Sequence, residues 1–200
     1  TIGRRQRQMC IRDSGNTDDD FTINWDSQGV PSGWNLNVDT SGPMVTDSIS
    51  WNGFYEFDVV LSVPSDALAG STATFSMSAA SNGDSSQTAS QEFTAVVDQH
   101  YGVTLSVDSD SKENKPGEDV DFIFNITNTG NGQDNYILSV SGPAVWNPVL
   151  SQNVSSINAV SVSQFTLTVS IPSDRDAGAS SGDIVVTVVS SDGLSTANST

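Results

Sequence analysis

The sequence has one cysteine, Cys10, and one histidine, His100, among 200 residues. A lone cysteine cannot close a disulfide within the chain, and cysteine-based zinc sites need several thiolates. A lone histidine cannot form a multi-histidine metal site. His100 also lies where one predicted domain meets the next, so we expect a solvated linker residue. These absences exclude a disulfide within the chain, a zinc-thiolate site and a multi-histidine site.

Basic residues are scarce as well, because seven Lys and Arg stand against 24 acidic residues and the net charge is −17. Binding to nucleic acid or to an anionic bilayer surface needs clustered cations, so we expect neither partner. The acidity has two interpretations. One is a solvated, repulsive surface, and the other is adaptation to salty water or loose binding of divalent cations.

No apolar run approaches the length of a membrane span, and no amphipathic helical stripe of useful length is present. Among the 24 acidic residues, 20 are Asp, which favours turns and caps over helices and strands. The composition therefore predicts short strands joined by many loops.

The first fourteen residues differ from the rest, since they hold the cysteine and four of the seven basic residues, Arg4, Arg5, Arg7 and Arg12. The segment Met-Cys-Ile-Arg-Asp-Ser at 9–14 resembles the translation of a transposase adaptor used in sequencing libraries. We interpret residues 1–14 as a non-native scar and leave them out of the fold prediction. The alternative, a basic targeting arm, lacks the apolar segment of a signal peptide.

One segment occurs twice, as Phe57–Gly70 and as Phe165–Gly178. Phe, Ser, Pro-Ser-Asp and Ala-Gly fall at the same offsets. Each copy has apolar residues at alternate positions and then a proline, which predicts a strand that ends before Pro64 and Pro172. An internal repeat of this kind predicts two domains of one fold.

Further matches extend the repeat with loops of unequal length. Gly15-Asn16 matches Gly130-Asn131 at an offset of 115, and Trp34-Asn35 matches Trp146-Asn147 at an offset of 112. The predicted domains are 15–97 and 98–200. In this comparison the first lacks counterparts of the two strands in 103–126, and the second lacks a counterpart of 93–97, so the chain is interpreted as a fragment of a longer array.

The second copy is the fuller one, with about seven short alternating strands and no helix. This pattern predicts an all-β chain of tandem immunoglobulin-like (Ig-like) β-sandwiches.

The run Pro116–Val120 and the strand Phe122–Gly130 resemble the CARDB and alpha-galactosidase-associated (NPCBM-associated) Ig-like modules. Trp146 and Phe165–Gly178 continue the resemblance in the family's order. It implies a noncatalytic extracellular module of bacterial or archaeal surface proteins or secreted hydrolases, with no catalytic residues. The chain departs from the family at Asn158-Ala159-Val160, where members commonly carry Pro-Gly-Glu.

The best metal candidate is the acidic segment 108–113, where alternate carboxylates on a loop could bind calcium. Its predicted ligands are Asp108, Asp110 and Glu113, with Asp98 nearby. The segment does not match an EF-hand, because Glu113 stands at position six instead of Gly and Asp119 at position twelve instead of Glu. Lys112 argues for the alternative, an ordinary acidic turn.

Two tryptophans, Trp25 and Trp51, have no counterpart in the second copy and are candidates for stacking against carbohydrate. Core packing is the alternative for both, and it is the expected role of the matched pair Trp34 and Trp146. Three Asn-X-Ser/Thr triplets are candidate glycosylation sites, at Asn125, Asn153 and Asn198. They also arise by chance in a chain rich in Ser, Thr and Asn.

The sequence therefore predicts a protein segment that is not an enzyme. We expect an extracellular or cell-surface spacer, stalk or adhesion module whose partners are other domains of a longer chain, or surface glycans or proteins. No cofactor is expected apart from the candidate calcium. The alternative is an accessory module of a secreted hydrolase, with a carbohydrate as ligand.

Overall fold

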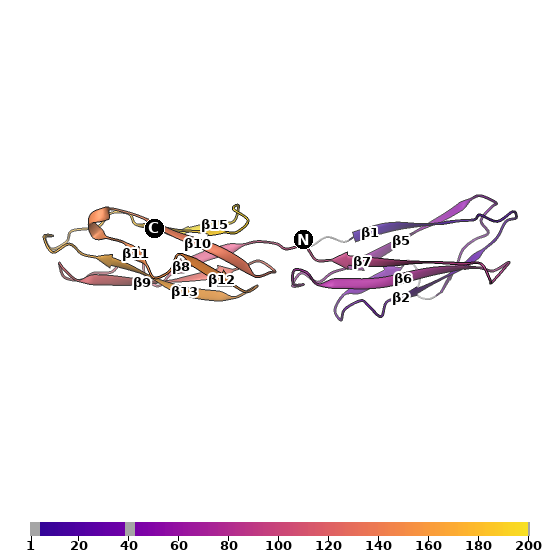
Figure 1. The fold of residues 1–200 in the computed structure, drawn as a ribbon, viewed down its shortest axis with the longest axis horizontal. Helices are drawn as coiled ribbons and strands as arrows, with labels where there is room; N and C mark the ends of the chain where they lie inside the picture. Colours follow the sequence, from indigo (N-terminus) through magenta and orange to yellow (C-terminus); the bar gives the residue numbers. More distant parts are fainter. Residues whose placement is uncertain (1–4, 39–42, 200) are drawn as a thin grey trace. The chain divides into compact units, whose positions relative to one another are not determined.

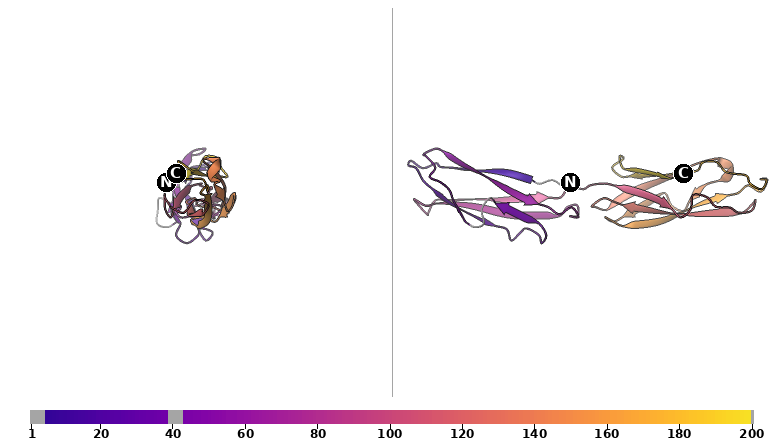
Figure 2. Two further views of the ribbon diagram at one scale, coloured as in Figure 1. Left: turned by 90° about the vertical axis from the view of Figure 1, so that its left-hand side faces the viewer. Right: turned by 180° about the vertical axis from the view of Figure 1, so that it is seen from behind.

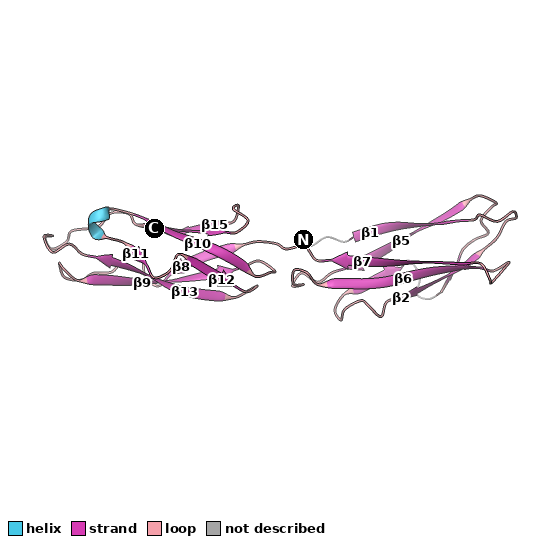
Figure 3. Cartoon of the chain, viewed as in Figure 1, coloured by secondary structure: helices cyan, strands magenta, loops and turns pink. Residues whose placement is uncertain are grey.

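A computed structural model describes residues 5–38 and 43–199 (Figure 1). The chain divides into two compact units, Thr1–Asp98 and Gln99–Thr200. Both are built from antiparallel strands, and the described helical structure is one short turn in the second unit, η1 (Ala144–Trp146), drawn in cyan in Figure 3. No helix in the described part of the chain is long and apolar enough to cross a membrane.

The first unit contains two sheets, with strand orders β1-β5-β3 and β4-β2-β6-β7. Its strands are β1 (Arg5–Arg12), β2 (Phe21–Asp26), β3 (Asn35–Val38), β4 (Met44–Val45), β5 (Phe54–Ser62), β6 (Thr72–Ser81) and β7 (Thr88–Val96). The two sheets face each other (Figure 2). They enclose an apolar core that includes Ile23, Phe57 and Met77.

The second unit has the same arrangement with one strand more, in the orders β11-β13-β9-β8 and β12-β10-β14-β15. Its strands are β8 (Val103–Val107), β9 (Asp119–Asn128), β10 (Asp134–Ser141), β11 (Val149–Leu150), β12 (Val154–Ile157), β13 (Val162–Ser170), β14 (Val185–Ser190) and β15 (Thr196–Ser199). Its core includes Ile126, Tyr136 and Val188, all 0% exposed. Two facing antiparallel sheets in each unit confirm the prediction of tandem Ig-like β-sandwiches.

The repeated segment forms the same structure in both units. Phe57 lies on β5 and Phe165 on β13, and both are buried in the core of their unit. Each strand ends two residues before the predicted proline. The prolines then begin a turn, because Pro64 O accepts from Ala67 N at 3.2 Å and Pro172 O accepts from Arg175 N at 3.3 Å. This confirms that the two segments are structural equivalents.

The N-terminal segment forms a strand that the fold prediction leaves out. Residues Arg5–Arg12, which we set aside as part of the 1–14 scar, form β1 and pair with β5 from Arg5↔Leu61 to Arg12↔Phe54. β1 therefore takes the place that β9 has beside β13. In the described residues the first unit thus lacks a counterpart of β8 alone, and not of both strands. The sequence comparison does not reach β1, because the scar interpretation leaves residues 1–14 out of it.

Candidate functional site

The predicted calcium loop is held together by a lysine. Lys112 Nζ donates to Asp108 Oδ2 at 2.5 Å and to Asp121 O at 2.6 Å, and it lies 5.3 Å from the centre of the Phe122 ring. Asp108 Oδ1 accepts from Ile123 N at 3.0 Å. The Lys112 hydrogen bond keeps the pKa of Asp108 below its usual value. Asp108 therefore acts as the anchor of the loop that follows β8.

The other predicted ligands are not gathered around Asp108. Asp98, Asp110 and Glu113 are all exposed. Among residues 5–38 and 43–199, no three acidic, histidine or cysteine side chains are grouped in a way that could hold a metal ion. Calcium binding at this loop stays a prediction.

The tryptophans divide by exposure. Trp146 is buried in the second core, and Trp34 and Trp25 are half-buried against the first. Trp51 is 64% exposed, in the loop that leads to β5, and Phe54 close by is 60% exposed. Of the two candidates for carbohydrate, Trp51 therefore has the accessible ring, whereas Trp25 packs partly against the core.

The three glycosylation candidates lie in different settings. Asn125 is half-buried on β9, and its Oδ1 accepts from Gln164 Nε2 at 2.8 Å. Asn153 is exposed before β12, but the Ser155 hydroxyl of its triplet is buried and donates to Ser163 Oγ. Asn198 is exposed on β15, and Thr200 of its triplet lies outside the described residues. By side-chain exposure, Asn153 and Asn198 are more accessible than Asn125.

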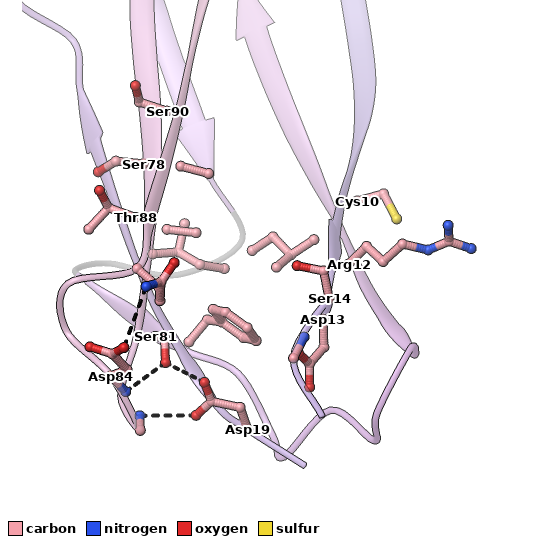
Figure 4. Close-up of a pocket in the computed structure, with 18 of the residues that line it drawn as sticks. Cys10, Arg12, Asp13, Ser14, Asp19, Ser78, Ser81, Asp84, Thr88 and Ser90 are labelled. Carbon is pink, nitrogen blue, oxygen red and sulfur yellow. Dashed lines mark hydrogen bonds between the residues drawn. The ribbon is translucent and has the colours of Figure 1, made fainter. Parts of the chain in front are cut away.

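A cleft of about 810 Å³ opens in the first unit between β1 and the sheet that contains β6 and β7 (Figure 4). Its lining includes a hydrogen-bonded group that we call the turn clasp, made in this unit of Asp19, Ser81 and Asp84. The Ser81 hydroxyl donates to Asp19 Oδ2 and accepts from Asp84 N at 2.9 Å. Asp19 Oδ1 accepts from Gly83 N at 3.1 Å. The clasp ties the start of β2 to the β6–β7 turn.

The second unit repeats the turn clasp with Asp134, Ser190 and Asp192. The Ser190 hydroxyl donates to Asp134 Oδ2 at 2.5 Å and accepts from Asp192 N at 3.3 Å. Asp134 Oδ1 also accepts from the Ser191 hydroxyl. Sequence analysis missed both clasps. A signal was present, since Asp19 and Asp134 are separated by the same offset of 115 as the matched Gly-Asn pairs.

The lowered pKa values of the clasp carboxylates fit a structural role. The Ser81 hydrogen bond lowers the pKa of Asp19, and the Ser86 hydrogen bond lowers that of Asp84. Burial raises the pKa of Asp134, but the hydrogen bonds from Ser190 and Ser191 outweigh it and the net shift is downward. A general acid in glycoside hydrolysis needs a raised pKa instead. These carboxylates are therefore suited to accept hydrogen bonds as anions.

His100, expected in a solvated linker, is exposed but anchored through its backbone. Its N donates to Asn131 Oδ1 at 2.6 Å, and its O accepts from Asn131 N at 3.2 Å. Gln99 Nε2 donates to Gln133 O at 2.9 Å. The segment that enters the second unit is therefore fixed to the loop after β9.

Both units thus belong to the class of Ig-like β-sandwiches. The sequence matches no known protein-family profile and no curated protein. Among solved structures, it is similar to a Porphyromonas gingivalis protein of unknown function, with 14% identity, a TM-score of 0.34, and coverage of 98% of this chain and 90% of that one.

Two other solved structures are similar at the same level. One is the secreted serine protease VesC from Vibrio cholerae, with 8% identity, a TM-score of 0.35, and coverage of 94% of this chain and 46% of that one. The other is the CsuC-CsuE chaperone-tip adhesion subunit complex of Acinetobacter baumannii, with 12% identity, a TM-score of 0.30, and coverage of 97% and 89%. Similarity this distant carries no argument about function.

Proposed function

We propose that the chain is a noncatalytic, extracellular segment of tandem Ig-like repeats that acts as a spacer, stalk or adhesion module. The observation that carries the proposal is the repetition of the turn clasp. In both units the buried or half-buried carboxylate, Asp19 or Asp134, is used to hold the unit's own turns. The clasp is therefore a repeated architectural element. The pKa values of its carboxylates are all lowered, so these groups do not form an acid-base pair with one raised and one lowered pKa.

The resemblance to CARDB and NPCBM-associated modules supports the same proposal, since those families are noncatalytic parts of longer surface or secreted proteins. The acidity supports it as well. With a net charge of −17, neighbouring copies of the chain repel each other, which favours separate, hydrated segments.

The experiment that tests a spacer is single-molecule extension of the chain held at its two ends. A spacer built of two independent sandwiches unfolds in two separate events. Each event lengthens the chain by about 3.5 Å per residue of the unit that opens, less the unit's folded length. A single event for the whole chain, or extension without any resisted step, would contradict the proposal.

A second function, carbohydrate binding as an accessory module, is favoured by one observation: the exposed ring of Trp51. Stacking of a sugar on an indole needs an accessible face, and Trp51 offers one beside the exposed Phe54. The test is a glycan array with the chain and with Trp51→Ala. Leu194→Ala, which removes an exposed apolar side chain from the second unit, is the matched control. Binding lost in Trp51→Ala alone supports this function, and no binding by the parent chain dismisses it.

A further inference from the structure

The residue that follows β1 has a buried carboxylate oxygen without a hydrogen-bond partner. Asp13 is 2% exposed. Its Oδ1 accepts from Gly15 N at 2.7 Å, whereas its Oδ2 accepts no hydrogen bond within the described residues. A buried anionic oxygen with neither a donor nor a cation beside it is unfavourable. The groups around Oδ2 therefore indicate which kind of partner belongs there.

The second unit shows the same place with all its hydrogen bonds. Asp13 N donates to Gly53 O at 3.0 Å, and Asn128 N donates to Ser161 O at 2.9 Å. Each of these acceptors directly follows a non-glycine residue with a positive φ. The side chains of Asp13 and Asn128 therefore start from equivalent backbone positions.

In the second unit the side-chain amide points at two carbonyl oxygens. Asn128 Nδ2 donates to Gly132 O at 2.8 Å and to Ile157 O at 3.0 Å. Gly132 lies in the loop between β9 and β10, and Ile157 is the last residue of β12. Neither acceptor belongs to β8 or to the segment before it. These contacts are therefore internal to the sandwich and do not depend on the chain that enters it.

The first of these carbonyls has an equivalent in Thr17 O. Thr17 lies two residues after Gly15, as Gly132 lies two residues after Gly130. A Cβ built on Gly15 would lie 2.9 Å from Asp13 Oδ1 and 3.7 Å from Thr17 O. The carboxylate and this carbonyl therefore flank the same point.

The second carbonyl has an equivalent in Ile49 O. Ile49 forms an antiparallel bridge with Asp19, and Ile157 pairs antiparallel with Asp134. Ile49 is 5% exposed, and its O accepts from Asp19 N at 3.0 Å. A carbonyl oxygen has two lone pairs, so Ile49 O can bind one further group. In the second unit the Asn128 amide is that further group.

The exchange of an amide for a carboxylate changes what can lie between these groups. Asn128 directs an NH₂ donor at the two carbonyls, whereas Asp13 directs an oxygen at them. Oxygens without a proton cannot hydrogen-bond to one another, which accounts for the missing partner of Asp13 Oδ2. Three converging oxygens, one of them charged, are a ligand set for a hard cation.

We propose that the first unit binds a calcium ion between Asp13 Oδ2 and the carbonyl oxygens of Thr17 and Ile49, with water as the remaining ligands. Calcium accepts carboxylate and carbonyl oxygens in flexible geometries, whereas magnesium demands a near-ideal octahedron. The site holds a single carboxylate, so it differs from the acidic segment 108–113. The segment 14–18 that covers Asp13 is exposed, so the ion has a path from solvent.

The role of the ion is structural, and it does not depend on the proposed function. It links the end of β1 to Ile49, in the segment before β5, as the Asn128 amide links the corresponding parts of the second unit. One carboxylate gives modest affinity, and we expect a dissociation constant of about 0.1–1 mM, as in extracellular calcium modules.

Thermal unfolding of the full chain tests the proposal. Tryptophan fluorescence reports mainly on the first unit, which has three of the four tryptophans. Calcium chloride at about 10 mM should raise the melting temperature of this unit by about 5 °C or more relative to chelator. Sodium chloride at equal ionic strength is the control for screening of the acidic surface. The same melting temperature in both salts overturns the proposal.

Asp13→Asn is the variant that identifies the ligand. It removes the charge and supplies the two carbonyls with the donor that Asn128 provides in the second unit. We expect its calcium response to be lost, while in chelator it is at least as stable as the parent, so that loss of response is not loss of fold. Asp47→Asn removes the same charge from an exposed position of the same unit and should keep the response. A calcium response kept in Asp13→Asn overturns the proposal.

The reciprocal variant moves the site to the second unit. Asn128→Asp places a carboxylate oxygen before the carbonyls of Gly132 and Ile157. Scanning calorimetry should then show a calcium-dependent rise in the melting temperature of the second unit that exceeds that of the parent. If the variant is unfolded in chelator, recovery of its circular dichroism spectrum with calcium is the equivalent result. A second unit that calcium neither stabilises nor restores overturns the proposed ligand set.

Discussion

Asp13 occupies the position in the first unit that Asn128 occupies in the second. Both side chains are buried, at 2% and 0% exposed. Each accepts a hydrogen bond from the glycine two residues later, Asp13 Oδ1 from Gly15 N at 2.7 Å and Asn128 Oδ1 from Gly130 N at 2.8 Å. The second polar atom of the two side chains has different surroundings.

Asn128 Nδ2 donates to Gly132 O at 2.8 Å and to Ile157 O at 3.0 Å. Asp13 Oδ2 has no hydrogen-bond partner within the described residues. We therefore expect Asp13→Asn to raise the free energy of unfolding of the first unit by about 1–2 kcal/mol, since a buried acceptor without a partner is replaced by a donor.

Urea unfolding followed by tryptophan fluorescence measures this change, because three of the four tryptophans, Trp25, Trp34 and Trp51, lie in the first unit. The reverse substitution, Asn128→Asp, is the control and should destabilise the second unit by about 1–3 kcal/mol. A stability of the Asp13→Asn chain equal to or below that of the parent would contradict the equivalence.

The Asp13–Asn128 pair shows which part of the repeat could be predicted from the sequence and which part could not. Alternating apolar residues and the Pro-Ser-Asp turn placed Phe57 and Phe165 in two sandwiches, because strand periodicity and proline geometry are local properties. The offset of 115 between Gly15 and Gly130, extended two residues backward, already pairs Asp13 with Asn128. Residues 1–14, interpreted as a scar, lie outside that comparison.

The candidate sites depended on longer-range contacts, and these were harder to predict. Nothing local indicates that the Ser81 hydroxyl reaches Asp19, 62 residues away in the sequence. In the calcium loop, by contrast, the presence of Lys112 within the acidic segment did favour an ordinary acidic turn over a calcium site. Exposure separated Trp51 from Trp25, and burial of single side chains depends on the packing of both sheets.

Backbone strain in one turn gives a second prediction. Val160 has a φ of 52°, a left-handed conformation that is costly for a β-branched residue, and Asn52 has the equivalent place in the first unit with a φ of 63°. Val160 is 77% exposed, so its replacement loses little packing. We expect Val160→Asn to stabilise the second unit by about 1 kcal/mol.

Thermal unfolding of the parent and Val160→Asn chains measures that difference. Asn52→Val makes the opposite exchange in the first unit and should lower its stability by a similar amount. An unchanged melting temperature in both variants would show that these turns adopt another conformation in solution.

The turn clasp of the second unit predicts a dependence on pH. The pKa of Asp134 in the folded chain lies below its value in an unfolded chain, about 3.9. Its contribution to stability is therefore complete above that value and is lost as the pH falls through the folded pKa. We expect Asp134→Asn to lower stability near neutral pH by about 1 kcal/mol or more, and the difference from the parent to shrink below about pH 4.

Urea midpoints of both chains between about pH 3 and pH 7 measure this dependence across the carboxylate range. Asp110→Asn, at an exposed position, removes the same charge without a clasp and serves as the control. A constant difference between Asp134→Asn and the parent over the whole range would mean that the clasp does not depend on an ionised carboxylate.

The last prediction concerns the loop of the candidate calcium site. Lys112 lies over the Phe122 ring and donates to Asp108, so Lys112→Met removes the cation while keeping much of the apolar stem. The pKa of Asp108 should rise toward its ordinary value, since the Lys112 hydrogen bond is the main cause of its lowering. The stability lost should be small and smaller still at high salt, because the pair is partly exposed.

Calcium titration of the same two chains separates the two interpretations of the loop. Removing the ammonium group frees Asp108 Oδ2 and adds net negative charge beside Asp110 and Glu113, so Lys112→Met should bind calcium more tightly than the parent. Lys112→Arg keeps the charge and is the matched control. If the parent chain binds calcium and Lys112→Met binds it no better, Lys112 does not compete with the ion and the carboxylates that bind calcium lie elsewhere on the chain.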